Sequence, residues 1–262
     1  MRLGSWVLDS VLFVFFLLML REGRLVLGRE RTSIFLWGSI LWTGIIENAM
    51  VMLGGYDYFA YANQVHFGGR VIQGYGGWVS WILFVPLVIC LGWFLLSLPA
   101  LLISRRIIGD RRSIWLKAAF AGVILVSFDM LLDPISVVNQ WWRWTSPGFY
   151  LRGVTFSNYI GWFFLLFFFG ALYERTVLQR RGFRWLSGLE GRIFGVDTME
   201  LSGLELRSVA RVFYFRLLIF LPVFFFCCMT VATIVTLNFC NNWGPFDSVF
   251  SNAFFTKHLP PP

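Results

Sequence analysis

The sequence predicts an all-α membrane protein, a polytopic bundle of about six transmembrane helices with one interfacial amphipathic helix. Composition is the first reason, because 58% of the 262 residues are hydrophobic and only 14% are charged, whereas soluble domains average about 25% charged residues. The second reason is that apolar stretches of about 20 residues, the length that crosses a bilayer, recur along the chain. We therefore expect residues 1–262 to form a single membrane domain whose partner is the lipid bilayer.

Six stretches qualify as spans. The first carries charged residues at 21–24 and lacks a small-residue cleavage site, so it is predicted to be an uncleaved helix and not a signal peptide. A seventh half-span within the glycine-rich stretch 54–77 is the alternative. The expected spans are residues 6–27, 33–53, 78–103, 114–133, 158–173 and 213–239.

Basic residues predict the orientation of these spans. Seventeen of the 22 Lys and Arg residues lie in or beside three links, which follow the first, third and fifth spans. Basic links face the cytoplasm in membrane proteins, so both termini are expected outside. We predict an integral protein of a prokaryotic cytoplasmic membrane.

The longest basic link, residues 174–212, has apolar positions at helical spacing. This pattern predicts a cytoplasmic amphipathic helix that lies on lipid head groups. Glu190 belongs to this link and is expected to matter little to activity. Residues 241–262 form a polar C-terminal tail without recognisable chemistry.

Several function classes are excluded by residues that the chain lacks. Two histidines are too few for a histidine-rich di-iron site or for paired haem ligands. The four cysteines form no C-x-x-C pair, and no glycine-rich nucleotide fingerprint is present. We therefore predict no metal, no cofactor and no nucleic-acid partner, because the basic links already account for the net charge of +8.

Two acids at the end of the fourth span are the best candidates for chemistry. Asp129 and Asp133 are four residues apart, so they share a helix face about 6 Å apart along the axis. Pro134 is expected to end the helix at Asp133. Like charge, the negative end of the helix dipole and apolar surroundings all penalise ionisation, so the pair should share at least one proton. The alternative is that Asp133 caps a turn and Asp129 pairs with Arg143 or Arg152.

Further polar groups should reach the same membrane level in this topology. Glu47 lies near the outer end of the second span, and Asn158 opens the fifth. Glu47 could instead be a buried carboxyl paired with an arginine, Asn48 or a tryptophan, and Asn158 could be a helix cap. His66, in the loop after the second span, could be an ordinary surface histidine.

The residues around the acid pair form an extended pattern, D-x-x-x-D-P, W-x-W and G-x-Y-x-x-G-V-x-x-S-N-x-x-G-W. It consists of Asp129, Asp133, Pro134, Trp142, Trp144, Gly148, Tyr150, Gly153, Val154, Ser157, Asn158, Gly161 and Trp162. Earlier residues add Glu47, Gly55, Tyr56, Tyr58, Val85, Pro86, Leu87 and Trp93. Over residues 40–175 the chain resembles the membrane carotenoid biosynthesis proteins, which include 1′,2′-hydratases of γ-carotene and of bisanhydrobacterioruberin.

The resemblance implies a cofactor-independent carotenoid hydratase, a lyase that adds water across the terminal C1=C2 bond of a carotenoid or other polyisoprenoid end group. Residue chemistry agrees, since a carboxylic acid can protonate C2 and aromatic faces can stabilise a cation. The expected catalytic residues are Asp129, Asp133 and Glu47. The expected substrate-binding residues are Asn158, Trp142, Trp144, Tyr150, Tyr56, Tyr58 and Trp162. The tryptophans could alternatively form an interfacial belt, and the chain could be a cyclase, an isomerase or a non-enzymatic carotenoid- or lipid-binding subunit.

Overall fold

The computed structural model describes residues 5–58, 64–67, 70–73, 81–109, 112–138, 141–144, 148–242 and 255–258. Within these residues the chain forms seven α-helices and one π-helical turn. The helices are α1 (Ser5–Leu27), α2 (Arg29–Met52), α3 (Leu87–Ile108), α4 (Ile114–Val138), α5 (Phe156–Tyr173), α6 (Arg184–Phe194) and α7 (Leu206–Asn242), and the π-helical turn η1 is Glu174–Leu178. The predicted all-α membrane bundle is confirmed.

Five helical segments are long and apolar enough to cross a membrane: Arg29–Met52, Leu87–Ile108, Ile114–Val138, Phe156–Leu178 and Leu206–Ile234. They match five of the six predicted spans. The remaining prediction, residues 6–27, coincides with α1, which packs against α2 and α3. The stretch 54–77 forms short strands where it is described, so no half-span is seen in those residues.

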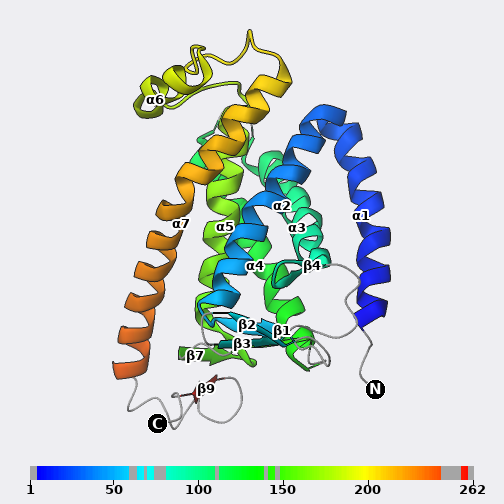
Figure 1. The fold of residues 1–262 in the computed structure, drawn as a ribbon, viewed down its shortest axis with the longest axis vertical. Coiled ribbons are helices and arrows are strands. Elements are labelled where there is room, and N and C mark those ends of the chain that lie inside the picture. The colour runs from blue at the N-terminus through cyan, green and yellow to red at the C-terminus, as the bar shows by residue number, and fades with distance from the viewer. Residues whose placement is uncertain are drawn as a thin grey trace.

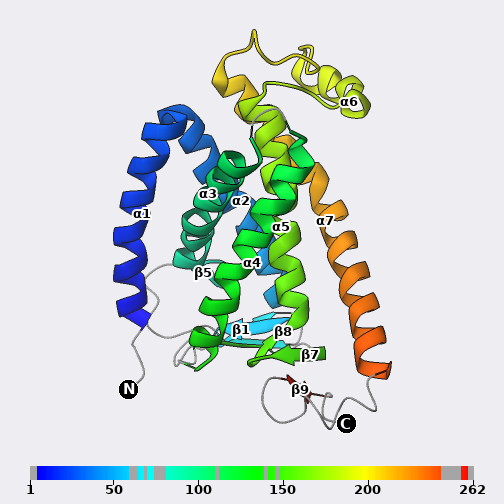
Figure 2. The ribbon, with the colours of Figure 1, turned by 180° about the vertical axis from the view of Figure 1, so that it is seen from behind.

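The long helices run back and forth between two ends of the molecule (Figure 1). The α1–α2 turn, the α3–α4 link and α6 lie at one end, and strands β1 (Tyr56–Tyr58), β2 (Gln64–Phe67), β3 (Arg70–Gln73) and β7 (Gly148–Leu151) lie at the other. α1 and α7 flank the bundle in both views, with α4 and α5 side by side between them (Figure 2). The three basic links therefore share one end, as their alternation along the sequence predicted.

Aromatic packing holds the centre of the bundle together. Phe35 of α2 contacts Phe94 of α3 and Phe169 of α5, at ring centroid distances of 6.0 and 5.0 Å. The Trp42 Nε1 of α2 donates a hydrogen bond to the Leu165 carbonyl over 3.1 Å. Because lipid tails are as apolar as these side chains, close packing and hydrogen bonds must supply the association of the helices.

α4 lies close against α5 because Gly122 faces Phe163. A Cβ atom at residue 122 would sit 3.0 Å from the Phe163 carbonyl oxygen. α4 also continues through Pro134 to Val138, so the prediction that the helix ends at Asp133 is wrong. Packing against neighbouring elements can compensate for the backbone hydrogen bond that proline removes from a membrane helix. Asp133 therefore lies inside a helical turn.

Short strands join the loops at the end opposite the basic links. They are β1 (Tyr56–Tyr58), β2 (Gln64–Phe67), β3 (Arg70–Gln73), β4 (Trp81–Ile82), β5 (Val85–Pro86), β6 (Trp142–Trp144), β7 (Gly148–Leu151), β8 (Val154–Thr155) and β9 (Phe255–His258). Antiparallel pairing of β1 with β6 puts Tyr56 opposite Trp144 and Tyr58 opposite Trp142. This pairing brings the loop after α2 to the loop after α4.

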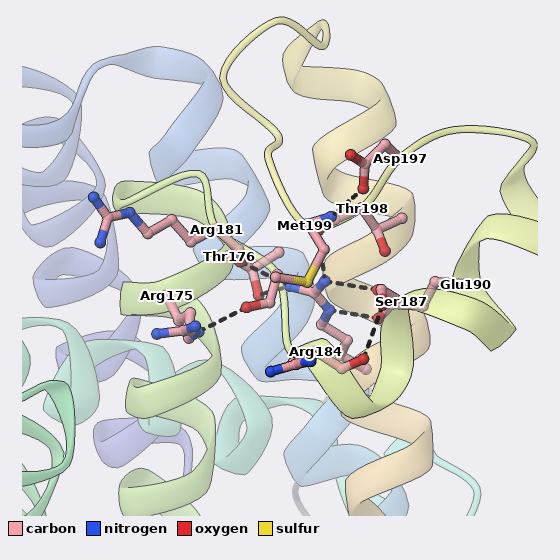
Figure 3. Close-up of polar contacts among 11 residues, drawn as sticks. Arg175, Thr176, Arg181, Arg184, Ser187, Glu190, Asp197, Thr198 and Met199 are labelled. Atoms are coloured by element: carbon pink, nitrogen blue, oxygen red, sulfur yellow. Dashed lines mark hydrogen bonds and ion pairs between the residues drawn. The ribbon is translucent and has the colours of Figure 1, made fainter.

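The link 174–212 contains a short amphipathic helix, α6, and the first turns of α7. Trp185, Leu189 and Ile193 of α6 are exposed and recur every four residues, which is the pattern of an interfacial helix. The opposite face is buried and carries Glu190 (Figure 3). The Glu190 carboxylate makes a bidentate ion pair with Arg216 of α7. Both side chains are fully buried, so Glu190 is part of a structural ion pair, and the expectation that it matters little to activity stays a prediction.

Candidate active site

A cavity of about 220 Å³ lies between α1 to α5 at the end of the bundle that carries the strands. Its lining is mainly apolar and aromatic, with a few polar groups. The lining residues are Leu12, Glu47, Tyr56, Tyr58, Val88, Ile89, Gly92, Trp93, Leu96, Leu132, Asp133, Ile135, Ser136, Trp141, Trp142, Trp144, Asn158 and Trp162. An apolar cavity with few convergent polar groups is the usual form of a ligand site.

The acid pair meets one amide at the edge of this cavity. The Asn158 Nδ2 of α5 donates hydrogen bonds to the Oδ2 atoms of Asp129 and Asp133, over 2.7 Å in both cases. Because both Oδ2 atoms bind the same nitrogen, they cannot be farther apart than twice the 2.7 Å hydrogen-bond length. Asp129 and Asp133 are buried, and the i, i+4 spacing places both on the α4 face that packs on α5.

Asn158 does not cap its helix. Thr155 occupies the N-cap position of α5, and Asn158 lies inside the first turn with its amide directed at α4. The cap alternative is therefore wrong. The Asp129 Oδ1 is buried and has no hydrogen-bond partner among the described residues. The Arg143 side chain lies outside the described residues, and among the side chains that are described no ion pair with an arginine is seen for either acid.

Glu47 reaches the same cavity from α2. The Trp93 Nε1 of α3 donates a hydrogen bond to its Oε1 over 3.0 Å. This contact corresponds to the tryptophan alternative for Glu47, and it also directs the carboxyl toward the cavity that Asp133 lines.

Four aromatic residues on β1 and β6 close the strand end of the cavity. The Tyr56 and Trp144 ring centroids are 4.8 Å apart, and those of Tyr58 and Trp142 are 6.0 Å apart. Burial raises the pKa of the Tyr58 phenol well above its ordinary value, and the Glu47 carboxyl raises it further, so Tyr58 is neutral. These rings line a cavity, and this placement argues against the alternative that they form a lipid-facing belt.

Two buried polar atoms of this aromatic group lack hydrogen-bond partners within the described part of the chain. They are the Tyr56 hydroxyl and the Trp144 Nε1. A buried donor without a partner is costly, so these atoms are suited to hold a water molecule or a hydroxylated ligand. They supply polar contacts next to an otherwise apolar lining.

Nine of the ten predicted site residues lie in or beside this cavity. Asp129 lies behind Asp133, connected to it through Asn158, and the remaining eight line the cavity. Tyr150 lies on β7 opposite Thr155 and is not among the lining residues. The His66 side chain lies outside the described residues.

Sequence reasoning missed several lining residues, chiefly Trp93, Trp141 and Ser136. Trp93 belonged to the family pattern, which was the signal that could have identified it. Its ring also stacks on Trp162 at a centroid distance of 4.0 Å. Ser136 follows Asp133 by three residues on α4, and helical spacing alone places it on a nearby face.

Comparison with known proteins identifies the family of this site. A family model described as carotenoid biosynthesis protein matches residues 11–184, a range that includes every lining residue of the cavity. The bisanhydrobacterioruberin hydratase of Haloarcula japonica is 36% identical over 106 residues, which cover 37% of this chain and 34% of that protein. The match thus spans about a third of the relative's length. No solved structure matches the chain.

Proposed function

Because the chain belongs to the carotenoid biosynthesis protein family, we propose that it adds water across the terminal C1=C2 bond of an acyclic carotenoid end group. One observation carries this proposal: Asp133 and Glu47 converge on one aromatic cavity, and Asp133 shares the Asn158 amide with Asp129. The reaction needs an acid, a water-activating base and a cation-tolerant pocket, and this cavity offers a candidate for each.

The cavity suits one end of a long apolar ligand. Its volume of about 220 Å³ is below the roughly 300 to 1,000 Å³ of pockets that enclose a drug-sized ligand. Leu132 and Ile135 line it from α4 and are 42% and 51% exposed, which supports an opening toward the bilayer beside α4. A polyene in the bilayer can therefore insert its end group while the rest of the chain stays in lipid.

Asp133 is the proposed proton donor because it lines the cavity, whereas Asp129 lies behind it. Two ionised carboxylates this close in apolar surroundings repel strongly, which favours a state in which the pair holds one proton. In the first step the O–H bond of Asp133 breaks, and the C1=C2 electrons bond the proton at C2. A tertiary cation is left at C1.

Glu47 is the proposed base for the second step. A water oxygen bonds to C1, and the water proton passes to the Glu47 carboxylate, which Trp93 holds in place. The faces of Trp142, Trp144 and Trp162 can stabilise the cation before water attacks. The product is a tertiary alcohol without net oxidation, and proton transfer through solvent from Glu47 back to the aspartate pair restores the starting state.

Expression in a host that accumulates an acyclic carotenoid tests this function. We expect a product with a hydroxylated end group whose oxygen comes from labelled water and not from labelled dioxygen. A ring or a shifted double bond would identify a cyclase or an isomerase, which uses the same acid but excludes water from the cation. An unchanged carotenoid bound to the purified protein would support a non-enzymatic binder and would overturn the hydratase.

A further inference from the structure

A second cavity lies at the opposite end of the bundle, among the basic links. It has a volume of about 640 Å³ and forms between the start of α4 and the segment that follows η1. Three arginines line it, Arg112, Arg175 and Arg181, together with Gln179 and Trp115. No acidic residue is among its lining residues. The cavity is therefore strongly positive, and the mechanism above does not use it.

Most other buried cations at this end are neutralised by nearby carboxylates. The buried Lys117 and the half-buried Arg105 bind Glu174 over 2.6 and 3.0 Å, and the buried Arg216 binds Glu190. Glu174 also accepts a hydrogen bond from Gln179 over 3.3 Å, so its two oxygens already have three donors. Within the described residues it is not available to the arginines of the second cavity.

The side chains of the three lining arginines are free to bind an anion. Arg175 uses Nε to donate to the Gly182 carbonyl over 2.9 Å and lies over the Phe183 ring at 5.1 Å, which fixes the guanidinium and leaves its terminal nitrogens available. Arg175 and Arg181 direct their guanidinium groups to the same side, away from Glu190 (Figure 3). In the part of the chain that the structure describes, Arg112, Arg175 and Arg181 have no carboxylate partner.

From this geometry we infer that the second cavity binds the phosphate of an anionic phospholipid head group. Guanidinium groups bind phosphate oxygens through paired hydrogen bonds, and the first turn of α4 adds the positive end of its helix dipole. Trp115 is 42% exposed and contacts Phe167 of α5 at a centroid distance of 5.6 Å. Exposed tryptophans are common at the level of the lipid head groups, so Trp115 places the second cavity at this level. A lipid phosphate is therefore the favoured ligand over a soluble phosphate.

Lipid titration of the purified full chain tests this site, with bound lipid counted by native mass spectrometry. The informative variant is Arg112→Gln with Arg181→Gln, because both side chains are exposed and hold no other element in place. The matched control is Arg184→Gln with Arg192→Gln, which removes the same charge from exposed positions of α6. Phosphatidylglycerol, phosphatidylcholine and inorganic phosphate are the three probes.

We expect phosphatidylglycerol to bind the unmodified chain and the control more tightly than phosphatidylcholine does. Loss of charge near the lipid surface is common to the double variant and the control. The double variant also loses the paired hydrogen bonds of the cavity to the phosphate, so it should bind phosphatidylglycerol at least about tenfold more weakly than the control does. Equal affinity in the double variant and the control would overturn the site. Inorganic phosphate that binds as tightly as the lipid would overturn the lipid assignment. The assay uses no carotenoid, so its result is independent of the proposed hydratase activity.

Discussion

The Trp93 indole nitrogen lies 3.0 Å from Glu47 Oε1 and connects α3 to a carboxyl 46 residues earlier in the chain. The contact holds an ionisable group inside a helical bundle, where such residues are rare and usually functional. It also leaves Glu47 of α2 in the lining of the cavity that Asp133 of α4 lines as well. The proposed mechanism therefore needs both carboxyls to reach the same bound end group.

Removal of the Trp93 donor should impair catalysis more than binding. Trp93→Phe keeps an aromatic ring against Trp162 but loses the hydrogen bond, so we expect kcat to fall about tenfold with KM nearly unchanged. Glu47→Gln should lower kcat by about 10²- to 10⁴-fold. The double variant should be no slower than Glu47→Gln alone, because the two residues act as a unit. Additive losses would show that Trp93 acts only through packing.

Loss of either acid of the pair should stop proton delivery. Asp133→Asn and Asp129→Asn each keep the side-chain shape, so the protein should insert normally while hydroxylated product per unit of inserted protein falls about 10²- to 10⁴-fold. Glu205→Gln is the matched control, because Glu205 is exposed in the basic link. Full activity in both aspartate variants would leave the acids as structural groups and would argue against the proposed mechanism.

The helical bundle, and the end of it at which the site lies, could be predicted from the sequence. Both depend on patterns that can be read along the chain without knowing which residues are in contact. Apolar length marks a span by itself, and the distribution of arginines fixes which span ends lie together. Together they place Glu47, Asp133 and Asn158 at one end of the molecule. The prediction that Pro134 ends the helix was wrong, because it considered only the local preference of proline. Packing of α4 against α5 keeps the helix continuous through this residue.

The remaining parts of the site depend on contacts between distant residues. The pairing of Tyr58 with Trp142 joins two loops 84 residues apart, and nothing in either loop predicts a strand partner. The burial of Glu190 was missed for a similar reason. Its immediate sequence neighbours, Leu189 and Gly191, give no sign of a buried partner, and the Arg216 that neutralises it lies 26 residues later. Helical periodicity distinguishes the two faces of α6, but it does not show which face packs against α7.

The Arg216–Glu190 ion pair should be a major contributor to stability at the basic end. Glu190→Gln leaves a buried guanidinium without its counter-ion, and breaking a buried pair in this way costs about 3–5 kcal/mol. Replacing both residues with Leu and Met should recover much of that loss, because no buried charge is left. Unfolding of the detergent-purified variants measures the difference. Equal stability of Glu190→Gln and Glu205→Gln would contradict the prediction.

The basic end of the bundle is predicted to face the cytoplasm. In a background without native cysteines, Arg184→Cys on α6 and Arg152→Cys between β7 and β8 put exposed thiols at opposite ends. A membrane-impermeant maleimide added to intact cells should label residue 152 and not residue 184. The reverse pattern would invert the orientation while leaving the fold unchanged.

The carotenoid is predicted to enter the cavity from the bilayer beside α4. Ile135 lines the cavity and is 51% exposed, so a larger side chain there should block the entry of a ligand from the bilayer while leaving the acid pair intact. We expect Ile135→Trp to raise KM for the carotenoid at least tenfold with a small effect on kcat. Leu131→Trp is the matched control, because Leu131 is 64% exposed on the same helix but does not line the cavity. If both substitutions had the same effect, the substrate would have to enter by another path, and the strand end of the cavity would be the next candidate.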